Sequence, residues 1–271
     1  MRELLRVVEA PRHCSYLPQE VATLEYRIIP EIDSASYSRF LTRGYRRFGI
    51  QFFRPGCRWC CRCRSIRVRV HDFAEGRRWR RVLKQNEDIE VVVRPPELTP
   101  EHLALYGRYH RFMESHRDWP HHDPRPQSYS QAFLLGGEGF AREVAYFRGG
   151  RLVGCALMDD VGDAVSLVYF YYAPEWREQS PGVFSILTQF RYARERGYRY
   201  AYLGYWIPEN RSMSYKSQYR PHEILTRYPA DGESPEWREP APSEIPAGSL
   251  HPSVRDLEPP PRHGTRERNA S

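Results

Sequence analysis

The feature that most constrains this chain is a dense group of cysteines near residue 60. Four of the six cysteines lie between residues 57 and 63, where two C-x2-C spacings overlap: Cys57, Cys60, Cys61 and Cys63. A C-x2-C spacing lets one short turn direct two sulfurs toward the same point, as a tetrahedral zinc ion or an iron–sulfur cluster requires. A fifth cysteine, Cys14, lies far upstream. We therefore expect Cys14, Cys57, Cys60 and Cys63 to hold zinc or a [4Fe–4S] cluster, with Cys61 as an alternative ligand.

Reduced cysteines that bind no metal, with a redox-sensing role, are the alternative. A disulfide framework is disfavoured, because such frameworks belong to short secreted domains, whereas this chain has 271 residues and bunched cysteines. Trp59, inside the group, is expected to cap it with apolar surface. The first ten residues carry acids and are too short for a secretion signal, and no run approaches the ~18 apolar residues of a membrane span. We expect a protein of the reducing cytoplasm that contacts no membrane.

The charge of the chain points to a polyanionic partner. The formal net charge is +7, and arginine supplies nearly all of the positive charge, since Lys84 and Lys216 are the only lysines. Guanidinium groups bind phosphates with two parallel hydrogen bonds, so a nucleic acid is the partner that this charge favours. The alternative is a basic surface without such a partner.

Residues 1–97 are expected to form an N-terminal α/β unit that carries the cysteines. Ile66, Val68 and Val70 alternate with polar residues, which predicts a half-buried strand over residues 65–73. A basic helix is predicted from about residue 76 to 86. Its cations form either a phosphate-binding face or a merely solvated one: Arg77, Arg78, Arg80, Arg81 and Lys84.

Residues 98–229 show a different order of elements: three antiparallel strands, a helix over residues 184–196 and a last strand over 200–205. This order resembles the GNAT acyltransferase fold. We therefore expect an α+β or α/β protein, in which a cysteine-knuckle α/β unit precedes a GNAT-like acyltransferase domain. In GNAT enzymes the loop before that helix offers backbone amides to the pyrophosphate of acetyl-CoA. Here Pro181 lacks an amide N–H and Glu178 adds a charge of the wrong sign, which favours an acyl carrier other than coenzyme A.

Several short motifs occur in order along residues 11–228. They are Cys14-Ser15-Tyr16-Leu17, Gly44-Tyr45-Arg46-Arg47-Phe48-Gly49, the cysteine motif from Pro55 to Arg67, Ser180-Pro181-Gly182, and the segment from Leu203 to Lys216 that contains Tyr205-Trp206-Ile207 and Met213-Ser214-Tyr215-Lys216. Together they resemble the motifs of the aminoacyl-tRNA–protein transferases of the N-degron pathway. Cys61 is extra to that pattern, and Pro181 replaces its usual leucine.

This resemblance implies an enzyme that forms a peptide bond. The α-amine of a protein that begins with Asp or Glu would attack the ester carbonyl of an aminoacyl-tRNA. Leucyl-tRNA is favoured as the donor because the chain has the length and layout of the bacterial members, which are mostly leucyltransferases; arginyl-tRNA is the alternative. The cations of the helix over residues 76–86 become candidates for tRNA contacts. The chemistry itself needs no cofactor, and we expect a monomer.

The resemblance also indicates where the substrates would bind. Lys216 or a nearby arginine would supply positive charge for the acidic terminus. Tyr172, Tyr205 and Tyr215 would stack on the terminal adenine or line the acyl pocket, or else belong to the core. A base must take a proton from the attacking ammonium group, and the sequence does not choose among its candidates, which are Asp159, Asp160 and Glu223.

Two functions outside this family are weighed against it. One is a non-catalytic RNA-binding protein with a metal knuckle, and the other is an ordinary acetyl-CoA acetyltransferase. Residues 230–271 are rich in Pro, Ser, Glu and Arg and poor in apolar residues, which predicts a disordered tail.

Overall fold

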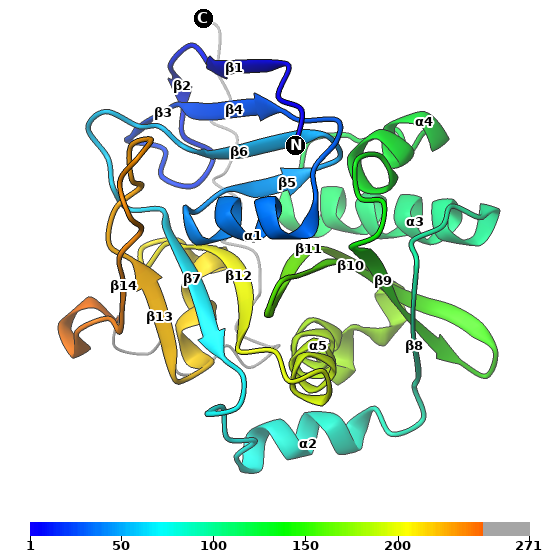
Figure 1. The fold of residues 1–271 in the computed structure, drawn as a ribbon. Helices are drawn as coiled ribbons and strands as arrows, with labels where there is room; N and C mark the ends of the chain where they lie inside the picture. The colour runs from blue at the N-terminus through cyan, green and yellow to red at the C-terminus, as the bar shows by residue number, and fades with distance from the viewer. Residues whose placement is uncertain (246–271) are drawn as a thin grey trace, which may run out of the picture.

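The computed structural model describes residues 1–245, and its strands form two main sheets (Figure 1). The smaller sheet is antiparallel and has the strand order β1-β4-β6-β5. Its strands are β1 (Leu5–Val8), β4 (Leu24–Ile28), β6 (Gln51–Pro55) and β5 (Arg46–Phe48). A short ladder of β2 (Arg12–His13) and β3 (Val21–Ala22) flanks the loop that carries Cys14.

The larger sheet has the strand order β14-β13-β7-β12-β11-β10-β9-β8. Only β11 and β12 pair in parallel among its described strands. The strands are β7 (Arg64–Arg69), β8 (Glu90–Arg94), β9 (Ala141–Arg148), β10 (Arg151–Val161), β11 (Ala164–Tyr172), β12 (Tyr200–Trp206), β13 (His222–Leu225) and β14 (Trp237–Arg238). Because β7 pairs with β12 and β13, and β8 pairs with β9, the division expected at residue 97 runs through one continuous sheet.

Helices cover both faces of the larger sheet (Figure 1). Helices α1 (Ser34–Thr42) and α3 (Pro100–Arg117) lie on one face, and α2 (Arg77–Gln85) and α5 (Pro181–Glu195) lie on the other. The shorter elements are α4 (Pro126–Tyr129), α6 (Arg211–Ser214), a π-helical turn η1 (Ser130–Leu134), and the 3-10 turns η2 (Pro174–Gln179), η3 (Tyr215–Gln218) and η4 (Pro242–Glu244). Within residues 1–245, no helix combines the length and the apolar character that a membrane crossing needs.

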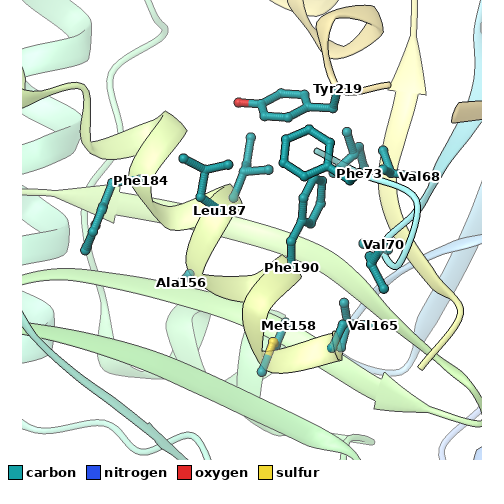
Figure 2. Close-up of a cluster of buried hydrophobic side chains, with 14 of the residues drawn as sticks. Val68, Val70, Phe73, Ala156, Met158, Val165, Phe184, Leu187, Phe190 and Tyr219 are labelled. Carbon is teal, nitrogen blue, oxygen red and sulfur yellow. The ribbon is translucent and has the colours of Figure 1, made fainter. Parts of the chain in front are cut away.

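The apolar core on the α5 face explains how the sheet is held (Figure 2). Leu187 and Phe190 of α5 are fully buried in this core. They share it with Val68 of β7, with Val70 just after β7, and with Val165 of β11. Each such side chain contributes about 1.5–3 kcal/mol on burial. The core therefore joins N-terminal and C-terminal parts of the sequence.

The predicted helix over 76–86 is confirmed as α2, and the predicted strand over residues 65–73 is confirmed as β7 only up to Arg69, where a turn begins. Ile66, Val68 and Val70 are all 0% exposed, as the alternation indicated. The order of three strands, a helix and a strand is confirmed by β9, β10, β11, α5 and β12. Helix α5 begins at Pro181, earlier than predicted, because proline suits the first helical position.

The disordered tail predicted from residue 230 is wrong for residues 230–245. Trp237 lies in β14, which pairs with β13. Its indole Nε1 donates to the carbonyl of Thr42 over 2.9 Å, and its ring lies 5.6 Å from that of Tyr202. One anchored tryptophan orders a segment whose composition is otherwise polar. The rest of the predicted tail, residues 246–271, lies outside the described residues.

Candidate functional site

The cysteines singled out from the sequence line one cavity of ≈ 470 Å³. Cys14 comes from the loop between β2 and β3, and the others come from the loop between β6 and β7: Cys57, Cys60, Cys61 and Cys63. Tyr205 of β12 also lines this cavity. The structure thus brings Cys14 to the cysteine turn across about forty residues of chain, a loop whose closure costs only a few kcal/mol.

The donor set in this cavity fits a thiolate-bound metal centre. All of these cysteines are free thiols. Backbone N–H groups point at two sulfurs, Tyr16 N at Cys14 Sγ and Thr23 N at Cys57 Sγ, each over 3.5 Å. Burial, together with the other three sulfurs, raises the pKa of Cys63 to about 12. Burial also raises the pKa of Cys60, and a bound cation would favour the thiolate forms that metal ligation requires.

The spacing of the sulfurs bears on which centre would fit. Among the described cysteines of the cavity, no three sulfurs lie within 4.8 Å of one another. Two sulfurs bound to one zinc ion are at most about 4.6 Å apart, because each Zn–S bond is about 2.3 Å. The cavity as it stands is therefore wider than a closed zinc site.

Trp59 does not cap the cysteines as expected. Its side chain is 83% exposed, and the guanidinium carbon of Arg58 lies 4.6 Å from its ring centre. The cysteine turn therefore holds its one tryptophan out in solvent, away from the thiols.

A second site is defined by the parallel strands β11 and β12, which diverge. Their register joins residues 164–166 to residues 200–202 and stops there, although both strands continue. In α/β sheets, ligands bind beyond the carboxyl ends of neighbouring parallel strands. We call this region, from Leu167 of β11 and Leu203 of β12 onward, the strand divergence.

Two cations occupy the strand divergence. Arg46 of β5 donates to Ser166 Oγ over 3.2 Å and to the carbonyl of Leu167. Lys216 Nζ donates to the carbonyl of Tyr205 over 2.8 Å. The two side chains therefore satisfy carbonyl groups on both strands where the ladder ends. Gly204 lets Arg46 approach, since a Cβ there would lie 3.1 Å from the Arg46 guanidinium carbon.

Lys216 is less suited to be a fixed charge than the sequence indicated. Burial and the nearby Arg46 lower its pKa to about 7, against the opposite effect of Cys63. At neutral pH it is charged only part of the time, whereas Arg46 stays charged. Sequence reasoning placed Arg46 in a motif but did not name it as a site residue. Successive side chains of a strand point to opposite sides, which is why Arg46 reaches the strand divergence and Arg47 does not.

The structure brings together two of the three predicted substrate tyrosines. Tyr172 ends β11, and its ring centre lies 5.0 Å from that of Tyr109. Burial, and then Tyr172 and Tyr215, raise the pKa of Tyr109, so Tyr215 lies near the same ring. Tyr205 lies apart, with its hydroxyl donating to the carbonyl of Phe53 over 3.0 Å and its ring beside the cysteine cavity.

Each of the three candidate bases already has a partner. Asp159 is 0% exposed, accepts from Arg47 at both carboxylate oxygens and accepts from the Tyr37 hydroxyl over 2.7 Å. Asp160 accepts from the hydroxyl of Tyr192 over 2.7 Å. Glu223 forms ion pairs with two arginines of β7, Arg67 and Arg69. Asp159 is therefore held in a buried ion pair, whereas Asp160 and Glu223 stay candidate bases whose carboxylates already have partners.

The predicted phosphate-binding cations all lie on α2, and all but Arg78 are exposed: Arg77, Arg80, Arg81 and Lys84. Arg78 instead lies with its guanidinium carbon 3.7 Å from the Trp79 ring centre and donates to the carbonyl of Gln218. Helix α2 follows the carboxyl end of β7, whereas the cysteine turn precedes its amino end. The structure therefore does not bring the basic helix and the cysteines together.

The order β9-β10-β11-α5-β12, with a parallel pair that diverges, resembles that of the GNAT acyltransferase fold, as the sequence predicted. The sequence matches the family described as "Arginine-tRNA-protein transferase, N terminus" over residues 12–81 and "Arginine-tRNA-protein transferase, C terminus" over residues 101–226. The chain belongs to the arginine-tRNA-protein transferase family. It is an aminoacyl-tRNA–protein transferase, and the resemblance seen in its motifs is confirmed.

Relatives of this chain match it over nearly their whole length. An aspartate/glutamate leucyltransferase of Helicobacter hepaticus is 37% identical over 224 residues, which cover 83% of this chain and 93% of that protein. An aspartate/glutamate leucyltransferase of Marinobacter nauticus is 35% identical over 241 residues, which cover 88% of this chain and 97% of that protein. A crystal structure of FemX matches 83% of this chain and 86% of its own at 10% identity, with a TM-score of 0.49.

Proposed function

We propose that this transferase moves leucine from leucyl-tRNA to the α-amine of proteins that begin with Asp or Glu. The observation that carries the proposal is the match to relatives named aspartate/glutamate leucyltransferase at 35–37% identity. The reaction also suits the fold, because α5 begins at Pro181, which offers no backbone N–H to the pyrophosphate of coenzyme A.

The reaction needs little beyond the positioning of two substrates. The amine nitrogen attacks the ester carbonyl carbon, the amide bond forms, and the bond to the tRNA ribose oxygen breaks. The attacking ammonium loses a proton and the ribose hydroxyl gains one. Holding amine and ester in contact supplies several kcal/mol of the barrier reduction. We place the substrates at the strand divergence, where Arg46 and Lys216 offer positive charge to an acidic side chain.

A transfer assay tests this function. Purified protein is incubated with tRNA charged with labelled leucine or labelled arginine, and with matched peptides that begin with Asp, Glu, Asn or Gln. We expect leucine on the Asp and Glu peptides and none on the Asn and Gln peptides. Transfer of arginine alone would instead identify an arginyltransferase. Tight tRNA binding without transfer of either amino acid would leave the non-catalytic RNA-binding function.

We further propose that Cys14, Cys57, Cys60 and Cys63 hold a metal centre, either a [4Fe–4S] cluster or zinc. The centre would tie the loop of Cys14 to the cysteine turn. Anaerobic purification followed by visible absorption and metal analysis distinguishes the two. Cys63→Ser should lose the metal, whereas Cys61→Ser, at the exposed cysteine of the turn, should keep it. Equal metal content in both variants would contradict this assignment.

The exposed cations of α2 remain proposed contacts for tRNA phosphates: Arg77, Arg80, Arg81 and Lys84. Each contact with a phosphate releases counterions and makes binding weaker at high salt. We propose that the protein works as a monomer in the cytoplasm.

A further inference from the structure

Three arginines converge near the carboxyl end of β11. Arg117 is the last residue of α3, Arg177 lies in the turn η2, and Arg211 begins α6. Burial, and then the charges of Arg211 and Arg177, lower the pKa of Arg117. Three separate elements thus bring like charges within electrostatic reach of one another.

Contacts between α3 and η2 place Arg177 beside the last turns of α3, the helix that ends at Arg117. Arg108 of α3 forms an ion pair with Glu175 of η2 over 2.8 Å. The guanidinium carbon of Arg177 lies 5.8 Å from the ring centre of Phe112, also on α3. The last turns of α3 therefore lie directly against η2.

Within residues 1–245, neither Arg117 nor Arg177 forms an ion pair with a carboxylate, although Arg108, close by, does. Holding Arg117 and Arg177 near each other without a carboxylate partner is unfavourable, and it suits a site whose anion arrives with a ligand. Guanidinium groups match phosphate oxygens in geometry and charge.

Aromatic rings adjoin these arginines. Tyr172, at the end of β11, feels the charges of both Arg177 and Arg117, and it packs against Tyr109 at 5.0 Å between ring centres. Tyr215, the residue before Lys216, lies near Tyr109 as well, since after burial and Tyr172 it too raises the pKa of Tyr109. Cations beside tyrosines are what an unpaired nucleotide requires, because its phosphate binds the cations and its base stacks on a ring.

We propose that Arg117 and Arg177 bind backbone phosphates of the single-stranded 3′ end of aminoacyl-tRNA, with Tyr172 as a stacking surface for a base. This inference rests on the proposed function and extends it, because it places the nucleotide carrier at the carboxyl end of β11, next to the strand divergence. Coenzyme A carries phosphates of the same chemistry, so the test includes it.

The test compares Arg117→Gln and Arg177→Gln with Arg111→Gln, which removes the same charge from an exposed position on α3. Two readouts are used: leucine transfer with separate KM values for leucyl-tRNA and peptide, and binding of uncharged tRNA over a range of salt concentrations. We expect the KM for leucyl-tRNA to rise about tenfold or more in the two site variants, with the KM for peptide unchanged. The slope of log affinity against log salt should become shallower by about 0.7 for each lost single-strand contact.

The control Arg111→Gln should match the wild type in both readouts. Melting temperatures verify that the variants fold, and Arg117→Lys, which keeps the charge but loses the two-pronged geometry, should lie between wild type and Arg117→Gln. If the site variants behave like Arg111→Gln while the wild type transfers leucine, the inference is overturned and the function stands.

If the wild type transfers neither leucine nor arginine, the proposed function is contradicted. The tRNA-binding measurements then test the phosphate site by themselves. A loss of binding in Arg117→Gln but not in Arg111→Gln then supports the phosphate site. Coenzyme A binding to the wild type that Arg117→Gln abolishes, with tRNA binding unchanged, overturns the inference.

Discussion

At the scale of single residues, the ion pair of Arg47 and Asp159 is the clearest case of a motif residue with a structural role. Both side chains are almost fully buried, at 2% and 1% exposure. Removing one partner of a buried ion pair leaves the other charge uncompensated. We therefore expect Asp159→Asn to lower the free energy of unfolding by about 3 kcal/mol, as measured by urea titration.

Asp160→Asn is the matched control, because its carboxylate is partly exposed and accepts a hydrogen bond from Tyr192. It should cost about 1 kcal/mol or less. A stable Asp159→Asn protein that has lost transfer activity would restore Asp159 as the catalytic base and contradict the structural assignment.

We expect substitution by alanine to affect stability differently at Trp59 and at Trp206. Trp59 is 83% exposed and Trp206 is 0% exposed. Trp59→Ala should leave the melting temperature within about 1 °C, since exposed positions contribute little to stability. Trp206→Ala should destabilise the protein by about 3–5 kcal/mol. A large loss of stability in Trp59→Ala would show that the cysteine turn is packed more closely than its exposure indicates.

At the scale of elements, Gly204 controls how β12 accommodates Arg46. Its φ of +83° lies in the left-handed region, and an added Cβ would press on the Arg46 guanidinium. We expect Gly204→Ala to cost about 1–2 kcal/mol for the backbone alone, and to reduce leucine transfer as well, because Arg46 is displaced from the strand divergence.

Gly149→Ala separates the two effects, since Gly149 also has a positive φ, of +54°, but faces open space. It should show the backbone cost and unchanged transfer. Equal activity in the two variants, measured at a temperature where both are folded, would argue against a role for Arg46 in the reaction.

The elements that could be predicted are those whose signal is local. The alternation of Ile66, Val68 and Val70 predicted β7, and the run of basic residues after Gly76 predicted α2. The place of β7 in the larger sheet could not be predicted, because its partners β12 and β13 come from far along the chain.

The candidate site was predictable to a smaller extent. Spacing and the motifs indicated the cysteines, and the structure places Cys14 beside them. The arginines that converge at the end of β11 come from three elements, so no local pattern marks Arg117, Arg177 or Arg211 as a group. Nor could the sequence say which residue of the Arg46-Arg47 pair reaches the strand divergence.

At the scale of the whole molecule, one sheet connects the two parts that the sequence indicated. β7 lies between β12 and β13, and β8 completes the opposite edge beside β9. The cysteine cavity and the strand divergence both lie along β12, since Tyr205 lines the first and its carbonyl binds Lys216 in the second. The cysteine cavity and the strand divergence are therefore joined by one residue of β12.

The stability of the whole molecule should fall in acid, because several buried or half-buried glutamates hold their charge. Burial opposes the charge of Glu25, but the Tyr45 hydroxyl and Arg54 lower its pKa below the ordinary 4.5. Arg191 and Arg194 lower the pKa of Glu75, and the pKa of Glu143 is lowered as well. Burial alone would raise the pKa of Glu143, but His102, Arg94 and the N–H of Glu97 lower it by more. A carboxylate whose folded pKa is depressed stabilises the fold above its unfolded pKa, and this stabilisation is lost as the pH falls through the folded pKa.

We therefore expect the urea midpoint to be steady from about pH 7 to about pH 5 and to drop steeply below about pH 4.5. Glu143→Gln should be less stable than the wild type at pH 7, because Arg94 and His102 lose their acceptor charge, and should lose less further stability in acid. Glu178→Gln, at an exposed glutamate, should follow the wild-type curve. A wild-type midpoint that is the same at pH 7 and pH 3.5 would mean that these ion pairs do not hold the two parts of the chain together.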